Sequence, residues 1–362
     1  MEQINTYSLR RSRLLNILRK EKLDGLLIMK PVNRYYLSGF RGSAGMIVFT
    51  GERALLLTDF RYEEQARQQA SDWEIVRYQG DPLETLRNVL QEMKVTRLGF
   101  EEDYVTCGQL KTFIAKLDQV SFIGLEDPVG LLRAVKDPDE IMYIKQAAFI
   151  SDQAFLHILD IIRPGLKEID IAAELEYLMR KLGSEGPAFE TIVASGFRSS
   201  LPHGAASEKR LAEGDMIVMD FGAVYQGYHS DLTRTVVLGK ATSEQKRIYQ
   251  LVLRAQEAGL QSVMAGASCN EIDALARGII AGEGYGPYFG HSLGHGVGLE
   301  IHEHPRLTEK NEKKLQAGMI VTVEPGIYLP DWGGVRIEDL VLVKEKGCQV
   351  LSQAPKELIE LA

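Results

Sequence analysis

The chain has 362 residues, 45% hydrophobic and 25% charged, a size and composition that predict a soluble globular protein of two domains. Its formal net charge of −8 argues against nucleic acid or an anionic membrane as a main partner, and no apolar run is long enough to span a bilayer. The three cysteines lie far apart and suit neither a disulfide framework nor a thiolate zinc site, which favours a reducing, cytoplasmic setting.

The first third of the chain alternates between helical and strand-like segments. Residues 12–23 carry apolar side chains at helical spacing, and residues 24–30 follow as a short buried strand. Further strands are predicted at 45–50 and 54–60, and a helix over 83–95 precedes a strand at 97–101. This alternation predicts an α/β domain, a mixed sheet covered by helices, over residues 1–130.

A long helix is predicted over residues 135–162, where the second domain, residues 131–362, begins. Asp137 can cap this helix, and Pro138 suits its first turn. Asp139 and Glu140 then lie at the positive end of the helix dipole. This start signal places the domain boundary at about residues 125–137.

The second domain contains an internal repeat. Residues 214–222 and 318–326 align, and each has an acid, Asp220 or Glu324, six positions after one glycine and two before another. Each segment is followed by a turn and a strand with a further acid, Asp231 or Glu338. Two similar hairpins, each preceded by helices, predict an α+β domain with pseudo-two-fold symmetry.

The spacing of the four acids predicts that they converge. A four-residue loop at 224–227 would set Asp220 and Asp231 opposite each other on one face of a hairpin. Glu324 and Glu338 are likewise symmetric about the turn between them. At ~4 Å each pair of like charges repels by ~4 kcal/mol at an effective dielectric of about 20, so divalent cations are expected among the carboxylates.

Histidine is concentrated in one glycine-rich stretch. Four of the seven histidines lie within residues 290–305, and glycines there allow the backbone to approach a metal closely. Carboxylates with a single imidazole form an oxygen-rich ligand set. That set suits Mn²⁺, Co²⁺ or Fe²⁺ better than a closed tetrahedral zinc site.

These residues resemble a known family. The acids and His295 are similar to the five-ligand dinuclear site of the pita-bread metallopeptidases (peptidase family M24), which include methionine aminopeptidase, aminopeptidase P, prolidase and creatinase. The N-terminal third resembles the creatinase-type N-domain more loosely. Creatinase does not keep the ligands and methionine aminopeptidases usually lack the N-domain, so the resemblance implies the proline-peptidase branch. The segments that carry the resemblance are MDFGA, SDLTRT, GHSLGHGVGLEIHE, VTVEPGIY and GVRIEDLVLV, with NRYYLSGFRGSAG and LLTDFRY in the N-terminal third.

The resemblance implies two divalent metal ions per chain, with Mn²⁺ ahead of Co²⁺ and Zn²⁺. Asp231 and Glu338 bridge the ions, Asp220 completes one site, and His295 and Glu324 complete the other. Two cations sharing a water lower its pKa, so that a metal-bridging hydroxide forms near neutral pH. Glu324 then handles the proton of this nucleophile.

Five further residues are implied to contact the substrate. His291 and His302 stabilise the tetrahedral oxyanion, and His203 lies on the substrate side. Arg306 matches the arginine that holds the terminal carboxylate of a prolidase substrate, a task suited to a guanidinium fork. Arg336 contacts the acidic cluster or the substrate.

The expected function is hydrolysis of the Xaa-Pro bond in dipeptides, because a fixed arginine disfavours longer chains. The alternatives are an aminopeptidase P that acts on longer Xaa-Pro peptides and a catalytically silent binding module on the same fold. The resemblance also implies a homodimer in which residues 33–43 reach the partner's active site. An equally open interpretation takes that stretch as a strand-to-turn segment of the N-domain core.

Three neighbouring side chains receive smaller roles. Thr233 is in phase with Asp231 and is a candidate hydrogen-bond donor to a ligand. His229 is expected to be structural. His304 is expected to be an exposed loop residue.

Overall fold

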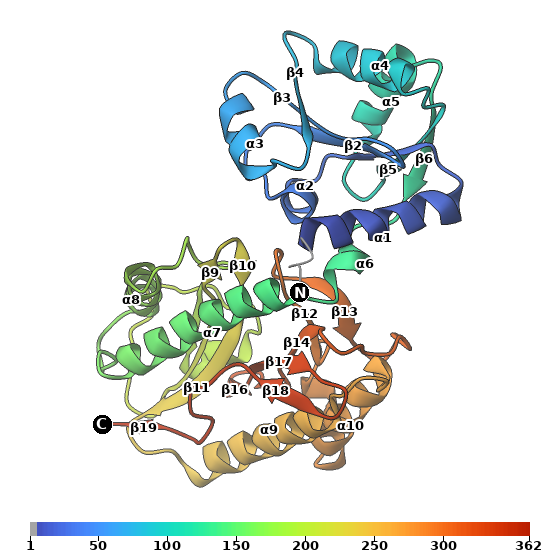
Figure 1. The fold of residues 1–362 in the computed structure, drawn as a ribbon. Coiled ribbons are helices and arrows are strands. Elements are labelled where there is room, and N and C mark those ends of the chain that lie inside the picture. The colour runs from blue at the N-terminus through green and yellow to red at the C-terminus, as the bar shows by residue number, and fades with distance from the viewer. Residues whose placement is uncertain (1–5) are drawn as a thin grey trace. The chain divides into compact units, whose positions relative to one another are not determined.

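The computed structural model describes residues 6–362. The chain forms two compact units, Met1–Arg133 and Ala134–Ala362, shown in Figure 1. Among the described residues, no helix combines the length and apolar character needed to cross a bilayer.

The N-terminal unit is built on a six-stranded mixed sheet in the order β4-β3-β2-β1-β5-β6. Strands β1, β2 and β3 are joined by antiparallel pairing, and the remaining neighbours pair in parallel. Apolar side chains of α4 and α5 share a core with one face of the sheet, so the predicted α/β organisation is confirmed. The elements are α1 (Thr6–Glu21), β1 (Gly25–Ile28), α2 (Pro31–Ser38), β2 (Met46–Thr50), β3 (Ala54–Thr58), α3 (Glu63–Gln69), β4 (Glu74–Arg77), α4 (Pro82–Glu92), β5 (Arg97–Glu101), α5 (Cys107–Lys116), β6 (Ser121–Leu125) and α6 (Gly130–Arg133).

Residues 31–38 form a helix, so the strand-to-turn interpretation of residues 33–43 is wrong. Pro31 lies in the first turn of α2, where its fixed φ suits a helix and its missing N–H costs nothing. Gly39 ends the helix with a left-handed φ of 77°, and its N–H donates to the carbonyl of Tyr35.

The C-terminal unit repeats one pattern: a pair of helices followed by a sheet of antiparallel strands, to which β19 from the end of the chain adds a parallel strand in the first half. Helices α7 and α8 pack with the sheet β19-β11-β8-β7, and α9 and α10 pack with the sheet β13-β12-β14-β17-β18. Figure 1 shows the helices on the outside and the strands between them. Each half has its own apolar core, as the predicted pseudo-symmetry requires.

The elements of the first half are α7 (Pro138–Leu159), α8 (Glu168–Lys181), β7 (Ile192–Ser195), η1 (Gly196–Ser200), β8 (Met216–Phe221), β9 (Val224–Tyr225), β10 (Tyr228–His229) and β11 (Leu232–Leu238). Those of the second half are α9 (Ser243–Ser262), α10 (Cys269–Gly282), η2 (Gly286–Tyr288), β12 (Gly294–Gly296), β13 (Glu303–Leu307), β14 (Ile320–Val323), β15 (Gly326–Leu329), β16 (Gly333–Arg336), β17 (Asp339–Val343), β18 (Cys348–Val350) and β19 (Glu360–Leu361). Asp137 caps α7 through a reciprocal capping box with Glu140, as predicted.

The first acidic hairpin has a different register from the one predicted. Asp220 pairs with Thr233 rather than with Asp231. The turn is two residues long, because Gln226 and Gly227 both adopt positive φ, 51° and 78°, as tight hairpin turns require. A shift of two residues keeps every side chain on its original face, so both acids still point the same way.

The second acidic hairpin has the predicted register. Strand β14 pairs with β17, and β15 pairs with β16, in one continuous register. Glu324 and Glu338 lie between these two ladders at facing positions. Asp331, at the predicted centre of the turn, adopts a positive φ of 61°.

Candidate metal centre

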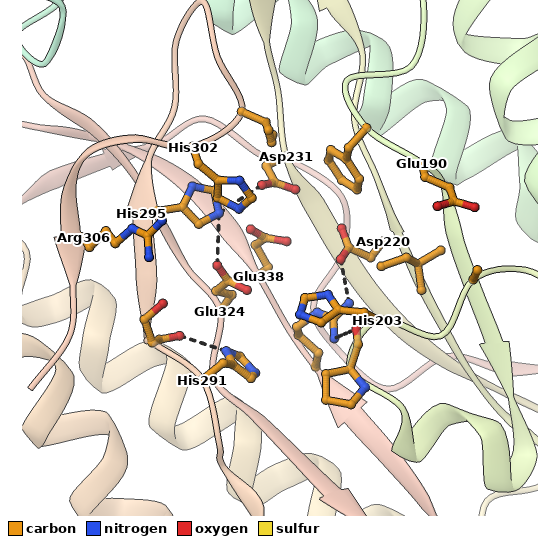
Figure 2. Close-up of a pocket in the computed structure, with 17 residues that line it drawn as sticks. Glu190, His203, Asp220, Asp231, His291, His295, His302, Arg306, Glu324 and Glu338 are labelled. Atoms are coloured by element: carbon orange, nitrogen blue, oxygen red, sulfur yellow. Dashed lines mark hydrogen bonds and ion pairs between the residues drawn. The ribbon is translucent and has the colours of Figure 1, made fainter. Parts of the chain in front are cut away.

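Five side chains predicted as metal ligands line a single cavity of about 460 Å³ in the C-terminal unit. Four of them lie at or next to strand ends, and His295 lies in the middle of the short strand β12. Figure 2 shows their carboxylate and imidazole groups pointing toward one another. Two pseudo-symmetric hairpins and the strand β12 therefore bring together the predicted set, Asp220, Asp231, His295, Glu324 and Glu338.

The imidazole of His295 presents one nitrogen to the carboxylates. Its Nδ1 lies 3.1 Å from the carbonyl oxygen of Gly296, a contact that an Nδ1–H donor satisfies. Its Nε2 lies 3.5 Å from Asp231 Oδ2 and 3.3 Å from Glu324 Oε1. Asp231, His295 and Glu338 each offer a ligand atom, all within 4.8 Å of one another. Such a group of atoms can hold a metal ion.

Asp231 and Glu338 are buried among other acids, which raises the pKa of both carboxyl groups. Burial, and then the negative charges of Glu338 and Asp220, raise the pKa of Asp231 well above its usual value. Burial and the charge of Glu324 do the same to the pKa of Glu338. Asp220 Oδ1 and Glu338 Oε1 are buried without a hydrogen-bond partner in the described part of the chain. Unpartnered oxygens in an acidic, oxygen-rich cluster fit divalent cations.

Glu324 behaves differently from the other acids. Burial alone would raise its pKa, but the hydrogen bond and charge of His295 lower it to about 2. The hydroxyl of Thr322 also donates to Glu324 Oε1 over 3.1 Å, and accepts from the backbone N–H of His295 over 3.0 Å. Glu324 is therefore ionised at neutral pH and is held in place beside the imidazole.

The ligands are oriented by polar side chains behind them. The hydroxyl of Thr233 donates to Glu338 Oε2 over 2.7 Å, which confirms the predicted donor role. Buried Arg336 donates from Nη2 to Asp220 Oδ2 over 2.6 Å and from Nε to Thr233 over 3.1 Å. Arg336 therefore contacts the acidic cluster, one of its two predicted contacts, while it also lines the cavity.

Sequence reasoning missed Tyr328. Its buried hydroxyl lies 2.9 Å from His291 Nε2 and 2.8 Å from Arg336 Nη1, and burial raises its pKa to about 12. Tyr328 therefore stays neutral and links His291, through Arg336, to the acidic cluster. The available signal was its position four residues after Glu324, on the same face of the hairpin.

The three substrate-side histidines predicted from the resemblance all line the cavity. Burial lowers the pKa of His291, and burial with the neighbouring His295 lowers that of His302. His203 is exposed on the loop between η1 and β8. The lowered pKa values of His291 and His302 favour neutral imidazoles, which can donate one N–H to a substrate oxygen.

Two other histidines have structural surroundings. His304 lies half-buried in β13, so the prediction of an exposed loop residue is wrong. The reason is the antiparallel pairing of β13 with β12, which draws this segment into the sheet. His229 Nδ1 lies 3.1 Å from the carbonyl oxygen of Gly298, in keeping with the expected structural role.

Arg306 lies on the outer strand β13 and lines the same cavity. Its residue partner across the ladder is His295. Within residues 6–362, its guanidinium forms no ion pair or hydrogen bond with another residue. An unpaired guanidinium at the edge of an acidic metal-binding cavity can bind a carboxylate of a ligand.

The chain is similar to known peptidases over nearly all of its length. Residues 142–345 match the model of metallopeptidase family M24, and residues 10–135 match that of the creatinase/prolidase N-terminal domain. An Xaa-Pro dipeptidase of Pyrococcus horikoshii is 42% identical over 96% of this chain and 97% of its own.

Two solved structures are also similar to this chain. An Xaa-Pro dipeptidase from Bacillus anthracis has a TM-score of 0.96 and 45% identity, covering 98% of this chain and 100% of its own. An X-Pro aminopeptidase from Thermotoga maritima has a TM-score of 0.91 and 43% identity, covering 97% of this chain and 99% of its own.

Proposed function

The chain belongs to metallopeptidase family M24, with a creatinase-type N-terminal domain and a pita-bread C-terminal domain, and from this premise we propose that it hydrolyses the Xaa-Pro bond of dipeptides. The observation that carries this proposal is the unpaired guanidinium of Arg306, placed directly across the ladder from His295. In a dipeptide, the residue directly after the cleaved bond carries the free carboxylate, so a cation on the strand next to His295 favours substrates that end there. The similar Xaa-Pro dipeptidases support this substrate class.

The proposed cofactor is a pair of divalent cations, with Mn²⁺ ahead of Co²⁺ and Zn²⁺. Asp231 and Glu338 would be shared by both ions, Asp220 would complete one site, and His295 with Glu324 would complete the other. Bound there, the ions would polarise the scissile carbonyl and bring the pKa of a water close to neutrality. The support is the unpartnered, buried oxygen on both Asp220 and Glu338.

Two side chains are assigned to the proton and to the developing oxyanion. Glu324, ionised and held beside His295, is able to accept the proton of the attacking water. His302 makes no hydrogen bond to the described residues, so its N–H is free to donate to the scissile carbonyl oxygen.

His291 reaches the substrate only by exchanging a bond. Its Nδ1 lies 2.9 Å from the carbonyl oxygen of Ser292, and its Nε2 faces the hydroxyl of Tyr328. Both ring nitrogens are thus engaged within the protein. We assign His291 to the oxyanion together with His302, on the condition that substrate displaces one of these two contacts.

The remaining substrate contacts lie around the cavity. Arg306 would bind the proline carboxylate through its two-pronged fork. His203 would contact the peptide from the opposite wall. Arg336, which donates to the carbonyl oxygen of Pro202 over 3.1 Å, would fix the loop that carries His203.

The second candidate is release of the N-terminal residue from longer Xaa-Pro peptides. The similarity to an X-Pro aminopeptidase and the exposed position of Arg306 favour it. A silent binding module is a weaker candidate, because all five predicted ligands are present and converge on the cavity.

One experiment separates these functions. Metal-stripped protein is reloaded with Mn²⁺, Co²⁺ or Zn²⁺, and kcat/KM is measured for Xaa-Pro and Xaa-Pro-Yaa with the same first residue. A preference for the dipeptide supports the proposal. A preference for the tripeptide supports the aminopeptidase, and no hydrolysis with any metal supports the binding module.

The proposed assembly is a homodimer in which residues 33–43 reach the partner's active site. Arg41 is exposed in this segment, with its guanidinium 4.8 Å from the ring centroid of Tyr35 and a 3.0 Å bond to that hydroxyl. Light scattering at assay concentration, with the activity of an Arg41→Ala variant, tests the contribution. A fully active monomer would contradict it.

The proposed compartment is the cytoplasm. Cys107, Cys269 and Cys348 are free thiols. Mass spectrometry of protein isolated under alkylating conditions should find all three alkylated, whereas a native disulfide would contradict the assignment.

A further inference from the structure

A second unpaired charge, that of Glu190, lines the cavity. Glu190 lies two residues before β7, and its side chain is exposed. In the described part of the chain, its carboxylate has neither an ion-pair partner nor a hydrogen-bond partner. An unpaired carboxylate on a cavity wall is free to meet a positive group of a ligand. The sequence offered no sign of this, because Glu190 belongs to none of the acidic repeats.

Glu190 and Arg306 lie at opposite ends of the cavity. Strand β7, which follows Glu190, is the outer strand of one sheet, and β13, which carries Arg306, is the outer strand of the other. Figure 2 shows the two side chains on opposite sides of the acidic cluster. If Arg306 holds the C-terminal carboxylate, as in the proposed function on which this inference rests, the N-terminal residue lies on the side of Glu190.

The position of Glu190 relative to the candidate ligands distinguishes two positive groups that it could meet. Ile192 of β7 pairs with Asp220, and Glu190 lies two residues before β7, outside the set of candidate ligands. The α-ammonium of a substrate is bonded to the Cα next to the scissile carbonyl and stays within about 2.5 Å of the carbonyl carbon. A lysine or arginine head extends roughly 6 Å from Cα. Because Glu190 lines the cavity but lies outside the candidate ligands, we expect it to meet the longer side chain rather than the α-ammonium.

The wall beside Glu190 is apolar. Phe189 directly precedes Glu190, Ile192 lies two residues after it, and Ala205 forms a bridge with Ile192; all three line the cavity. Such a wall covers the methylene stem of a long side chain, and a carboxylate beyond it meets a cationic tip.

We propose that Glu190 is a specificity residue that favours dipeptides with a cationic N-terminal side chain, Arg-Pro and Lys-Pro. It acts on the side chain of the first residue and leaves the metal centre untouched.

The test uses a pair of substrates that differ only in charge. Arg-Pro and citrulline-Pro have nearly the same shape, so the ratio of their kcat/KM values isolates the positive charge. This ratio should be roughly two- to five-fold in the wild-type enzyme, as expected for an exposed ion pair, and should fall to near one in Glu190→Gln. Glu190→Lys should instead favour Glu-Pro over Gln-Pro.

Glu257→Gln is the matched control. Glu257 is an exposed acid on α9 of the same unit and does not line the cavity. Its variant should keep the wild-type ratio. Metal content and far-UV circular dichroism should be the same in all variants, because Glu190 is exposed and forms no hydrogen bond or ion pair with residues 6–362.

Three outcomes would overturn the proposal. If the ratio of kcat/KM for Arg-Pro to that for citrulline-Pro is unchanged in Glu190→Gln, the carboxylate does not bind the cationic side chain. An equal fall in kcat/KM for every dipeptide in Glu190→Gln would show that Glu190 binds the α-ammonium instead. If wild-type enzyme cleaves no Xaa-Pro dipeptide, the proposed function fails as well, whereas the first two outcomes leave it standing.

Discussion

Arg306 lies directly across from His295 in the ladder between β12 and β13. Facing residues on antiparallel strands have Cβ atoms about 5 Å apart, so the sheet holds the base of the Arg306 side chain next to that of the candidate ligand His295. A substrate whose carboxylate binds Arg306 is thereby limited in length. This relationship links a feature of the sheet to the choice between dipeptides and longer peptides.

Arg306→Ala should raise KM for Xaa-Pro dipeptides far more than for amidated Xaa-Pro-NH₂. A charge-assisted hydrogen bond is worth about 1.5–3 kcal/mol, or roughly ten- to over a hundred-fold. Arg306→Lys should recover only part of the loss, because an ammonium cannot reproduce the planar fork. Metal content should not change. If Arg306→Ala leaves the ratio of KM for Xaa-Pro to that for Xaa-Pro-NH₂ unchanged, the result would favour the aminopeptidase function.

Asp231→Asn and Glu338→Gln should each abolish binding of the metal pair and peptidase activity. Both substitutions keep the shape of the side chain but remove a charge that the cations need. Plasma mass spectrometry of dialysed protein measures the metal per chain, and wild-type protein should lose activity to a chelator and regain it with Mn²⁺. Full activity in protein that contains no metal would disprove the metal centre.

Thr233→Val should weaken metal binding roughly ten- to a hundred-fold while the fold is retained. The hydroxyl holds Glu338 by a 2.7 Å hydrogen bond, and loss of such a donor frees the carboxylate to rotate. Thr191→Val is the matched control, because the hydroxyl of Thr191 is buried with no hydrogen-bond partner among the described residues. Titration with Mn²⁺ should separate the two variants. Equal affinities would show that Thr233 is only a packing residue.

Metal binding should release protons and weaken as the pH falls. The raised pKa values of Asp231 and Glu338 keep a proton in the metal-free cluster, which an incoming cation must displace. Calorimetry in buffers of different ionisation enthalpy counts the protons released. No release of protons at any pH above the ordinary carboxyl pKa of about 4 would contradict the coupling.

The same shifts determine how the stability of metal-free protein depends on pH. The folded-state pKa is raised, so folding takes up a proton. This contribution to stability is fully present below the unfolded carboxyl pKa of about 4 and is lost as the pH rises through the raised value. Chelator-treated protein should show this loss in urea titrations. Loading with Mn²⁺ should remove it.

Glu168→Gln should lower the free energy of unfolding by roughly 3 kcal/mol and raise KM. The buried carboxylate accepts hydrogen bonds from Ser195, Arg198 and Ser207, at both ends of the loop that carries His203. Losing one partner of a buried ion pair is costly. Urea denaturation and steady-state kinetics measure the two effects.

The control for Glu168 is Glu208→Gln, since among the described residues the Glu208 carboxylate pairs only with Lys167, at the surface. It should change the free energy of unfolding by less than about 1 kcal/mol. If both substitutions change the free energy of unfolding and KM equally, Glu168 has no particular role in holding the loop.

Much of the site could be predicted from local pattern. The symmetric spacing of Glu324 and Glu338 placed them at facing positions, because a strand repeats every two residues and the turn between them is centred on Asp331. Thr233 was identified by the same periodicity. These predictions depend on single segments, because the two-residue alternation of side chains along a strand does not depend on where the strand lies in the fold.

Only the tertiary structure determined which distant segments contact one another. Arg336 and Asp220 are 116 residues apart in sequence, and Thr233 and Glu338 are 105 apart, yet each pair is hydrogen-bonded. Periodicity gives the face of a strand but neither its exact register nor its neighbour in the sheet, which is why the pairing of Asp220 was off by two residues. Glu190 belongs to no repeat, and only the packing of the outer strand brings it to the cavity.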